Sequence, residues 1–125
     1  MVRYVVDLEK LPDFEDYARS WISLIDKYGG THHGYFIPGV PPEAMPDASF
    51  SFPGLGTEGP SNVAVALFSF PDVETYNVYR RMVAEDEQCI ATNARFKASP
   101  CFLSYERNFL KPVFKSSTEP DNQSE

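Results

Sequence analysis

The fold of this chain is decided by the stretch NVAVALFSF, residues 62–70. Extended chain points alternate side chains to opposite faces, and in this stretch both faces are apolar. A strand that is apolar on both faces is buried on both, so helices should cover one face and a further layer the other. The simplest further layer is a second copy of the chain, and the sequence therefore predicts a homodimer.

Three more strands are predicted from residue types that favour extended chain. β-Branched and aromatic side chains are concentrated at residues 2–8, 31–37 and 101–109. Together with residues 62–70, these stretches provide a sheet of four strands.

Helices are predicted between the strands from apolar residues at helical spacing. The first should begin at Asp13 as its N-cap and end near Tyr28, where two glycines follow. Asp72 is expected to cap a second helix, which the acidic run at residues 85–87 ends. A shorter third helix is predicted over residues 87–97.

The order of these elements is β-α-β-β-α-α-β, which is typical of the ferredoxin-like plait. The predicted fold class is therefore α+β, with an antiparallel four-stranded sheet.

A chain of 125 residues is one domain, which we place at residues 1–115. The 23-residue connection at 38–60 holds six prolines and four glycines and predicts a long loop, whose role as a lid, a binding loop or an insertion stays open. Residues 116–125 form an acidic tail that we expect to be disordered.

Charge and composition exclude several classes of function. The formal net charge of −7 repels phosphate, so we expect no nucleic-acid partner. The sequence holds no apolar run long enough to span a membrane and no secretory leader, so we predict a cytoplasmic protein without membrane attachment. The two cysteines are then expected as free thiols.

Two motifs suggest a ligand site, but the residues around them argue against it. Residues 54–59 match GxGxxG, but prolines flank them and no helix follows to hold a pyrophosphate. His32 and His33 are adjacent in a strand, so they point to opposite faces and do not share one metal ion unless the strand bulges. One of them should face the core, and the sequence does not say which. We predict neither a metal nor an organic cofactor.

Three stretches resemble the bacterial branch of the NIPSNAP family. They are HHGYFIPG at residues 32–39, EGPSNVAVALFSFPDVETYNVYRRMVAEDEQC at 58–89 and CFLSYERNFLKPV at 101–113. The resemblance covers residues 1 to about 115 and implies a dimeric α/β barrel, in which two plaits pack sheet to sheet with their helices outside. That superfamily includes cofactor-independent monooxygenases and isomerases, whereas NIPSNAP proteins have no settled enzymatic role.

The leading functional hypothesis is a homodimer that binds a small apolar or aromatic molecule between sheet and helices. Its expected ligand-binding residues are Tyr17, Trp21, Tyr105 and Arg107, although Arg107 also suits an interface ion pair. One alternative is a cofactor-independent monooxygenase or isomerase in which a histidine of residues 31–37 moves a proton, with His33 and Tyr35 as the catalytic pair. The other is a non-enzymatic scaffold dimer. Whether the protein is an enzyme stays open.

Overall fold

The computed structural model describes residues 1–40 and 54–115. Its strands are β1 (Val2–Val6), β2 (Thr31–Phe36), β3 (Val63–Ser69) and β4 (Phe102–Arg107). Its helices are α1 (Leu11–Lys27), α2 (Val73–Val83) and α3 (Glu87–Ala98), with a short 3-10 helix η1 (Leu8–Lys10) before α1. The expectations for a lid within 38–60 and for a disordered tail at 116–125 concern residues 41–53 and 116–125, which lie outside the described residues.

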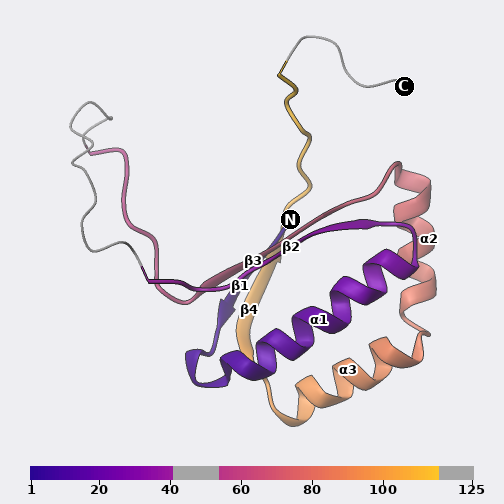
Figure 1. Cartoon of the computed structure of the whole chain (residues 1–125), viewed down its shortest axis with the longest axis horizontal. Helices are drawn as coiled ribbons and strands as arrows, with labels where there is room; N and C mark the ends of the chain where they lie inside the picture. The colour runs from indigo at the N-terminus through magenta and orange to yellow at the C-terminus, as the bar shows by residue number, and fades with distance from the viewer. Residues whose placement is uncertain (41–53, 116–125) are drawn as a thin grey trace.

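The four strands form one open antiparallel sheet in the order β2-β3-β1-β4, and the helices lie on one side of it (Figure 1). This arrangement confirms the predicted α+β class and the four-stranded antiparallel sheet. The strand order is also consistent with a ferredoxin-like plait. None of the helices in the described ranges is long and apolar enough to cross a membrane.

The register of the strands fixes which side chains face the helices. Tyr4 of β1 lies opposite Ala64 of β3 and Tyr105 of β4, so these three side chains share one face of the sheet. We call this face, which the helices cover, the inner face. The outer face carries the alternate residues, and there Arg3 lies opposite Val65. The inner-face residues of β1 are buried, whereas its outer-face residues are half-buried.

A bulge in β2 changes the face on which its residues lie. The pairing of β2 with β3 shifts between His32 and Gly34, and Gly34 has a φ of +122°, a conformation that L side chains rarely adopt. His32 therefore lies opposite Phe68 on the inner face, and Tyr35 lies opposite Ala66 on the same face. In a strand without a bulge, residues 33 and 35 would share a face. Because of the bulge, His32 and not His33 shares the inner face with Tyr35.

The start of α1 differs from the expectation, whereas the start of α2 agrees with it. The prediction that Asp13 caps α1 is wrong, because η1 runs directly into the helix and Lys10 occupies the N-cap position. Pro12 is tolerated in the first turn, where its missing N–H has no helical partner in any case. The expected cap of α2 is confirmed: Asp72 Oδ1 accepts from the backbone N–H of Thr75 at 2.7 Å.

The acidic run that was expected to end α2 also begins α3. Asp86 is buried, and its Oδ1 accepts from the backbone N–H of Gln88 at 2.8 Å as the N-cap of α3. Its Oδ2 accepts from Lys27 Nζ at 2.7 Å and from the Tyr28 hydroxyl. These hydrogen bonds from Lys27 and Tyr28 lower the pKa of Asp86 well below its usual range. Asp86 therefore ties the end of α1 to the start of α3.

The buried apolar residues form two clusters. One joins the sheet to the first half of α1 and centres on Phe14, which is fully buried. The other joins the second half of α1 to α2 and α3, through Leu24, Tyr79 and Cys89 among others. Cys101 lies in the first cluster, so the two free cysteines are buried in different parts of the core.

Candidate functional site

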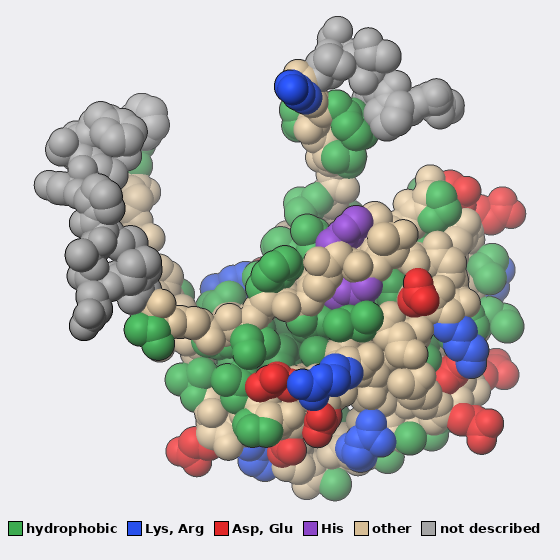
Figure 2. Space-filling model, viewed as in Figure 1, with side chains coloured by type: hydrophobic (Ala, Val, Ile, Leu, Met, Phe, Trp, Pro, Cys, Tyr) green, Lys and Arg blue, Asp and Glu red, His purple; other side chains and the backbone are tan. Residues whose placement is uncertain are grey.

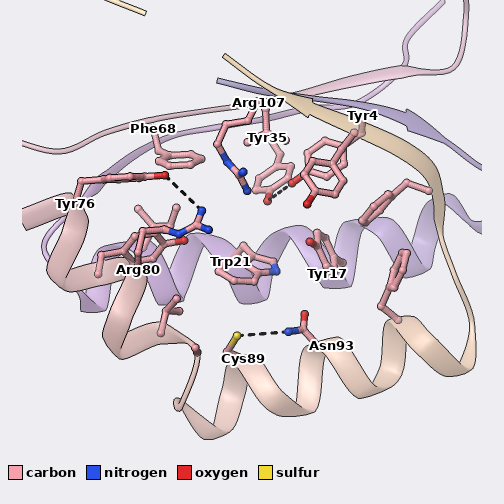
Figure 3. A pocket seen from close by; sticks show the side chains of 18 residues that line it. Tyr4, Tyr17, Trp21, Tyr35, Phe68, Tyr76, Arg80, Cys89, Asn93 and Arg107 are labelled. Carbon is pink, nitrogen blue, oxygen red and sulfur yellow. Dashed lines mark hydrogen bonds between the residues drawn. The ribbon is translucent and has the colours of Figure 1, made fainter. Parts of the chain in front are cut away.

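A cavity of about 450 Å³ lies on the inner face of the sheet and is lined by residues from all three helices. Its volume falls in the range of small-molecule sites, about 300–1,000 Å³. Figure 3 shows the sheet above the cavity, α1 behind it, and α2 and α3 along its other sides. Its walls are mostly aromatic, with a small number of polar and charged groups.

Three tyrosines form one end of the cavity. Tyr4 comes from β1, Tyr35 from β2 and Tyr17 from α1, and all three line the cavity. The hydroxyls of Tyr4 and Tyr35 are 3.4 Å apart, and the rings of Tyr4 and Tyr17 meet edge to face with centroids 6.3 Å apart. Burial raises the pKa of each of these hydroxyls above its usual value, so all three are neutral at physiological pH. They offer hydrogen bonds and no charge.

Trp21 follows Tyr17 by one helical turn and extends the aromatic wall along α1. Residues four apart on a helix share a face, and the two ring centroids are 6.3 Å apart. The Nε1–H of Trp21 is buried and has no hydrogen-bond partner among the described residues. A buried donor without a partner is costly, and no described residue relieves that cost.

Two arginines bring charge to the cavity. Arg107 reaches the inner face because its position in β4 lies opposite Val2, and its guanidinium lies over the Tyr105 ring at 5.6 Å from the centroid. Arg80 comes from the last turn of α2 and donates to the Tyr76 hydroxyl at 3.4 Å. Both line the cavity.

α3 contributes a thiol and an amide to the cavity, and neither group is a nucleophile. Cys89 and Asn93 are one turn apart on α3, and Asn93 Nδ2 donates to Cys89 Sγ at 3.7 Å. Burial raises the pKa of the Cys89 thiol, and the nearby charge of Asp86 raises it further. The thiol therefore stays protonated at neutral pH, and a thiol is a poor nucleophile.

The two histidines of β2 occupy opposite faces of the sheet. His33 is exposed on the outer face, where its Nε2 lies 2.9 Å from Ser69 Oγ. His32 lies on the inner face with its ring stacked on Tyr35, centroids 5.0 Å apart, but it does not line the cavity itself. Of the proposed catalytic pair, only Tyr35 is at the cavity.

His32 is placed to donate a hydrogen bond and not to accept a proton. Its Nδ1 accepts from the backbone N–H of Gly34 at 2.9 Å, so the neutral ring carries its proton on Nε2. Burial, with a smaller contribution from His33, lowers the pKa of His32 to about 4, and the ring is neutral at pH 7. Its Nε2–H is buried and lacks a partner among the described residues.

The structure brings together most of the residues that the sequence singled out. Tyr17, Trp21, Tyr35, Tyr105 and Arg107 all line the cavity, and His33 does not.

Sequence reasoning missed the other residues that line the cavity, among them Tyr4, Arg80, Cys89 and Asn93. The strict alternation of β1 was a usable signal for Tyr4, since it shares its face with two valines of the predicted strand. The four-residue spacing of Cys89 and Asn93 was a weaker one. Helical spacing was also a signal for Arg80, which follows Tyr76 by four residues, whereas its neighbour Arg81 does not share that face.

Within residues 1–40 and 54–115, no three His, Cys, Asp or Glu side chains are grouped so as to hold a metal ion. Comparisons of this chain with protein-family models, curated proteins and solved structures gave no match.

Proposed function

We propose that this protein is a homodimeric α/β-barrel protein that binds a small apolar or aromatic molecule between its sheet and its helices. The observation that carries the proposal is the 450 Å³ cavity on the inner face, with its aromatic walls. The neutral tyrosine hydroxyls of the lining supply polar contacts that orient such a ligand. A scaffold dimer would have no need of a cavity of ligand size.

Native mass spectrometry of freshly purified protein tests ligand binding directly. A dimer carrying one small apolar molecule per chain supports the proposal and identifies the ligand class. Purified apo protein is then titrated with hydrophobic compounds while the fluorescence of Trp21, the single tryptophan of the chain, is followed. Ligand entry should change this fluorescence, because Trp21 lines the cavity.

A matched pair of variants on α3 distinguishes the cavity from the surface. Asn93 lines the cavity and Ala94 does not, and both are exposed. Asn93→Phe fills part of the cavity and should weaken binding, whereas Ala94→Phe should leave it unchanged. Equal binding by both variants would contradict the proposed site.

The dimer is supported by the apolar residues of the outer face. In the isolated chain Phe36 is 57% exposed and Leu67 39% exposed, although both belong to strands of the sheet. Val65 lies between them, opposite Phe36, and is half-buried. In the view of Figure 2, most of the charged side chains lie over the helices and few lie around the two histidines of β2. Exposed apolar patches of this kind mark interaction sites.

A second copy of the chain would cover this face symmetrically, sheet against sheet. Sedimentation equilibrium should then give twice the 14.1 kDa of the chain. A mass of one chain at micromolar concentration would contradict the dimer.

Membership of the NIPSNAP family is part of the same proposal. The segment at residues 58–89 that carries the resemblance contains β3, α2 and the cap residue Asp86. The segment at 101–113 contains β4 with Tyr105 and Arg107. The resemblance therefore falls on parts of the chain that build the sheet and the cavity.

Catalysis by proton transfer has less support than binding. A cofactor-independent monooxygenase or isomerase needs a base at the cavity, and His33 lies on the other face. His32 has its Nδ1 lone pair engaged by Gly34. If the protein is nevertheless such an enzyme, replacing His32 or His33 by Ala should abolish turnover while the fold is retained.

A further inference from the structure

The cavity is positively charged although the chain is acidic. Its lining includes Arg80 and Arg107, and no Asp or Glu lines it within the described residues. The chain as a whole has a formal net charge of −7. The sign of the charge inside the cavity is thus opposite to that of the molecule.

The two arginines approach the cavity from different walls. Figure 3 shows Arg107 extending from β4 and Arg80 from α2, with both guanidinium groups turned into the cavity beside Tyr76 and Trp21. Their positive charges both act on the hydroxyl of Tyr79 and oppose the rise that burial causes in its pKa. Two like charges directed at one space repel each other, and an anion between them would relieve that repulsion.

Two other arginines of the protein, Arg3 and Arg19, pair with acidic residues. Arg3 pairs with Glu106 at 3.2 Å, and Arg19 pairs with Asp16 at 2.9 Å. Arg80 and Arg107 form no ion pair within residues 1–40 and 54–115, and their contacts are with tyrosines. The guanidinium donors are therefore available to a ligand.

We propose that the ligand of this cavity is a carboxylic acid with an apolar or aromatic body, bound as its carboxylate by Arg80 and Arg107. This inference rests on the proposed function and names the chemical class of its ligand. A guanidinium group matches a carboxylate with two parallel hydrogen bonds. A carboxylate, with one charge, also suits apolar surroundings better than a more strongly hydrated phosphate dianion.

The ligand's body would lie against the aromatic walls. Trp21, Phe68 and Tyr35 line the cavity with the arginines and offer flat apolar surface. Burial of this body provides affinity that does not depend on the charged group. Charge and apolar contact should therefore be separable by experiment.

The test uses pairs of probes that differ only in charge. The acids are 3-phenylpropionate and decanoate, and their neutral partners are 3-phenylpropanamide and decanamide. Binding to the full chain is followed by the fluorescence of Trp21. We expect at least one acid to bind about 10- to 100-fold more tightly than its amide, which is the range of a charge-assisted interaction. Raised salt should weaken binding of the acid more than that of the amide.

Variants of the arginines assign the preference to the cavity. Arg80→Gln and Arg107→Gln should each remove most of the preference for the acid and leave the affinity for the amide nearly unchanged. Both residues are exposed, so the fold should tolerate the change, and circular dichroism checks this. Arg81→Gln is the matched control, because Arg81 is the exposed neighbour of Arg80 and does not line the cavity.

Each outcome bears on a different proposal. If acids and amides bind equally and the arginine variants change nothing, the carboxylate inference is overturned while the binding site stands. If the preference is lost equally in Arg81→Gln, it reflects the surface and also overturns the inference. If no probe binds and no apolar compound changes the fluorescence of Trp21, the proposed binding function itself is overturned.

Discussion

The two faces of β3 carry apolar residues, but their burial is very different. On the inner face Ala64 and Ala66 are 1% and 0% exposed, beneath the aromatic residues that pack under the helices. On the outer face Val65 is half-buried and Leu67 is 39% exposed, although both side chains are larger and more hydrophobic than alanine. Burial within one chain is therefore set by the layer that covers a face, and not by the hydrophobicity of the residue.

The largest effect is expected from one charge placed on either face. Ala66→Asp would bury a carboxylate among apolar side chains at a cost comparable to the ~5–15 kcal/mol that keeps a domain folded. We expect no folded protein from this variant. Val65→Asp places the same group on the neighbouring residue of the outer face, and it should give a folded single chain in place of a dimer. Circular dichroism and sedimentation equilibrium measure the two results.

These two variants are each other's control. A dimeric Val65→Asp variant would show that the outer face is not the interface. A folded Ala66→Asp variant would show that the inner face is less tightly covered than its burial implies.

A smaller effect is expected from removing one ring on each face. Phe14 packs under the inner face and is fully buried, so Phe14→Ala should lower the free energy of unfolding by about 3–5 kcal/mol. Phe36 lies on the outer face and is 57% exposed in the single chain. The cost of Phe36→Ala should be small in dilute protein and larger at concentrations where a dimer forms. Urea unfolding at two protein concentrations measures both.

The contrast fails if the cost of Phe36→Ala is independent of concentration, since the outer face would then have no partner in solution. The cost of Phe14→Ala should be the same at both concentrations.

The smallest effect is expected from substitution of the two histidines of β2, of which His32 lies on the inner face and His33 on the outer face. The pKa of His32 falls from 6.5 to about 4 in the folded chain, so between these values the unfolded chain binds more protons than the folded one. The stability that depends on neutral His32 is complete above pH 6.5 and is lost as the pH falls toward 4. His32→Gln should therefore flatten the dependence of unfolding free energy on pH across this window. Urea unfolding at a series of pH values measures it.

His33→Gln is the matched control on the outer face and should keep the pH dependence of the unaltered protein. Asp86 does not interfere with this measurement. Its pKa is lowered in the folded chain, so the stability that it provides is lost only as the pH falls below about 3.8. A flattened profile in His33→Gln alone would reverse the assignment of the two faces.

The positions of the helices and strands were largely predictable from local sequence. The expected strands and helices all exist, and their ends shift by only a few residues. The cap at Asp72 followed from its place before an apolar helical pattern. The role of Asp86 could not be predicted from local sequence, because its partners Lys27 and Tyr28 lie far away in the chain. Local patterns cannot reveal a contact that only the fold creates.

The candidate site was predictable where it followed the period of one element. Tyr17 and Trp21 share a helical face, so their common position at the cavity follows from their spacing. The inward position of His32 could not be predicted in this way. Alternation with a period of two places residues 33 and 35 on one face, but the bulge at Gly34 brings His32 to the face of Tyr35 instead. One extra residue in a strand moves the side chains on one side of the bulge to the opposite face of the sheet.

By itself, the sequence determined the α+β class, the order of the elements and the aromatic character of the cavity's walls. These follow from side-chain periodicity and composition, which act over a few residues. Only the tertiary structure decided that Arg80 of α2 and Arg107 of β4 face one space, and that His32 rather than His33 lies inward. Both depend on register and on packing between distant segments, which no local pattern encodes.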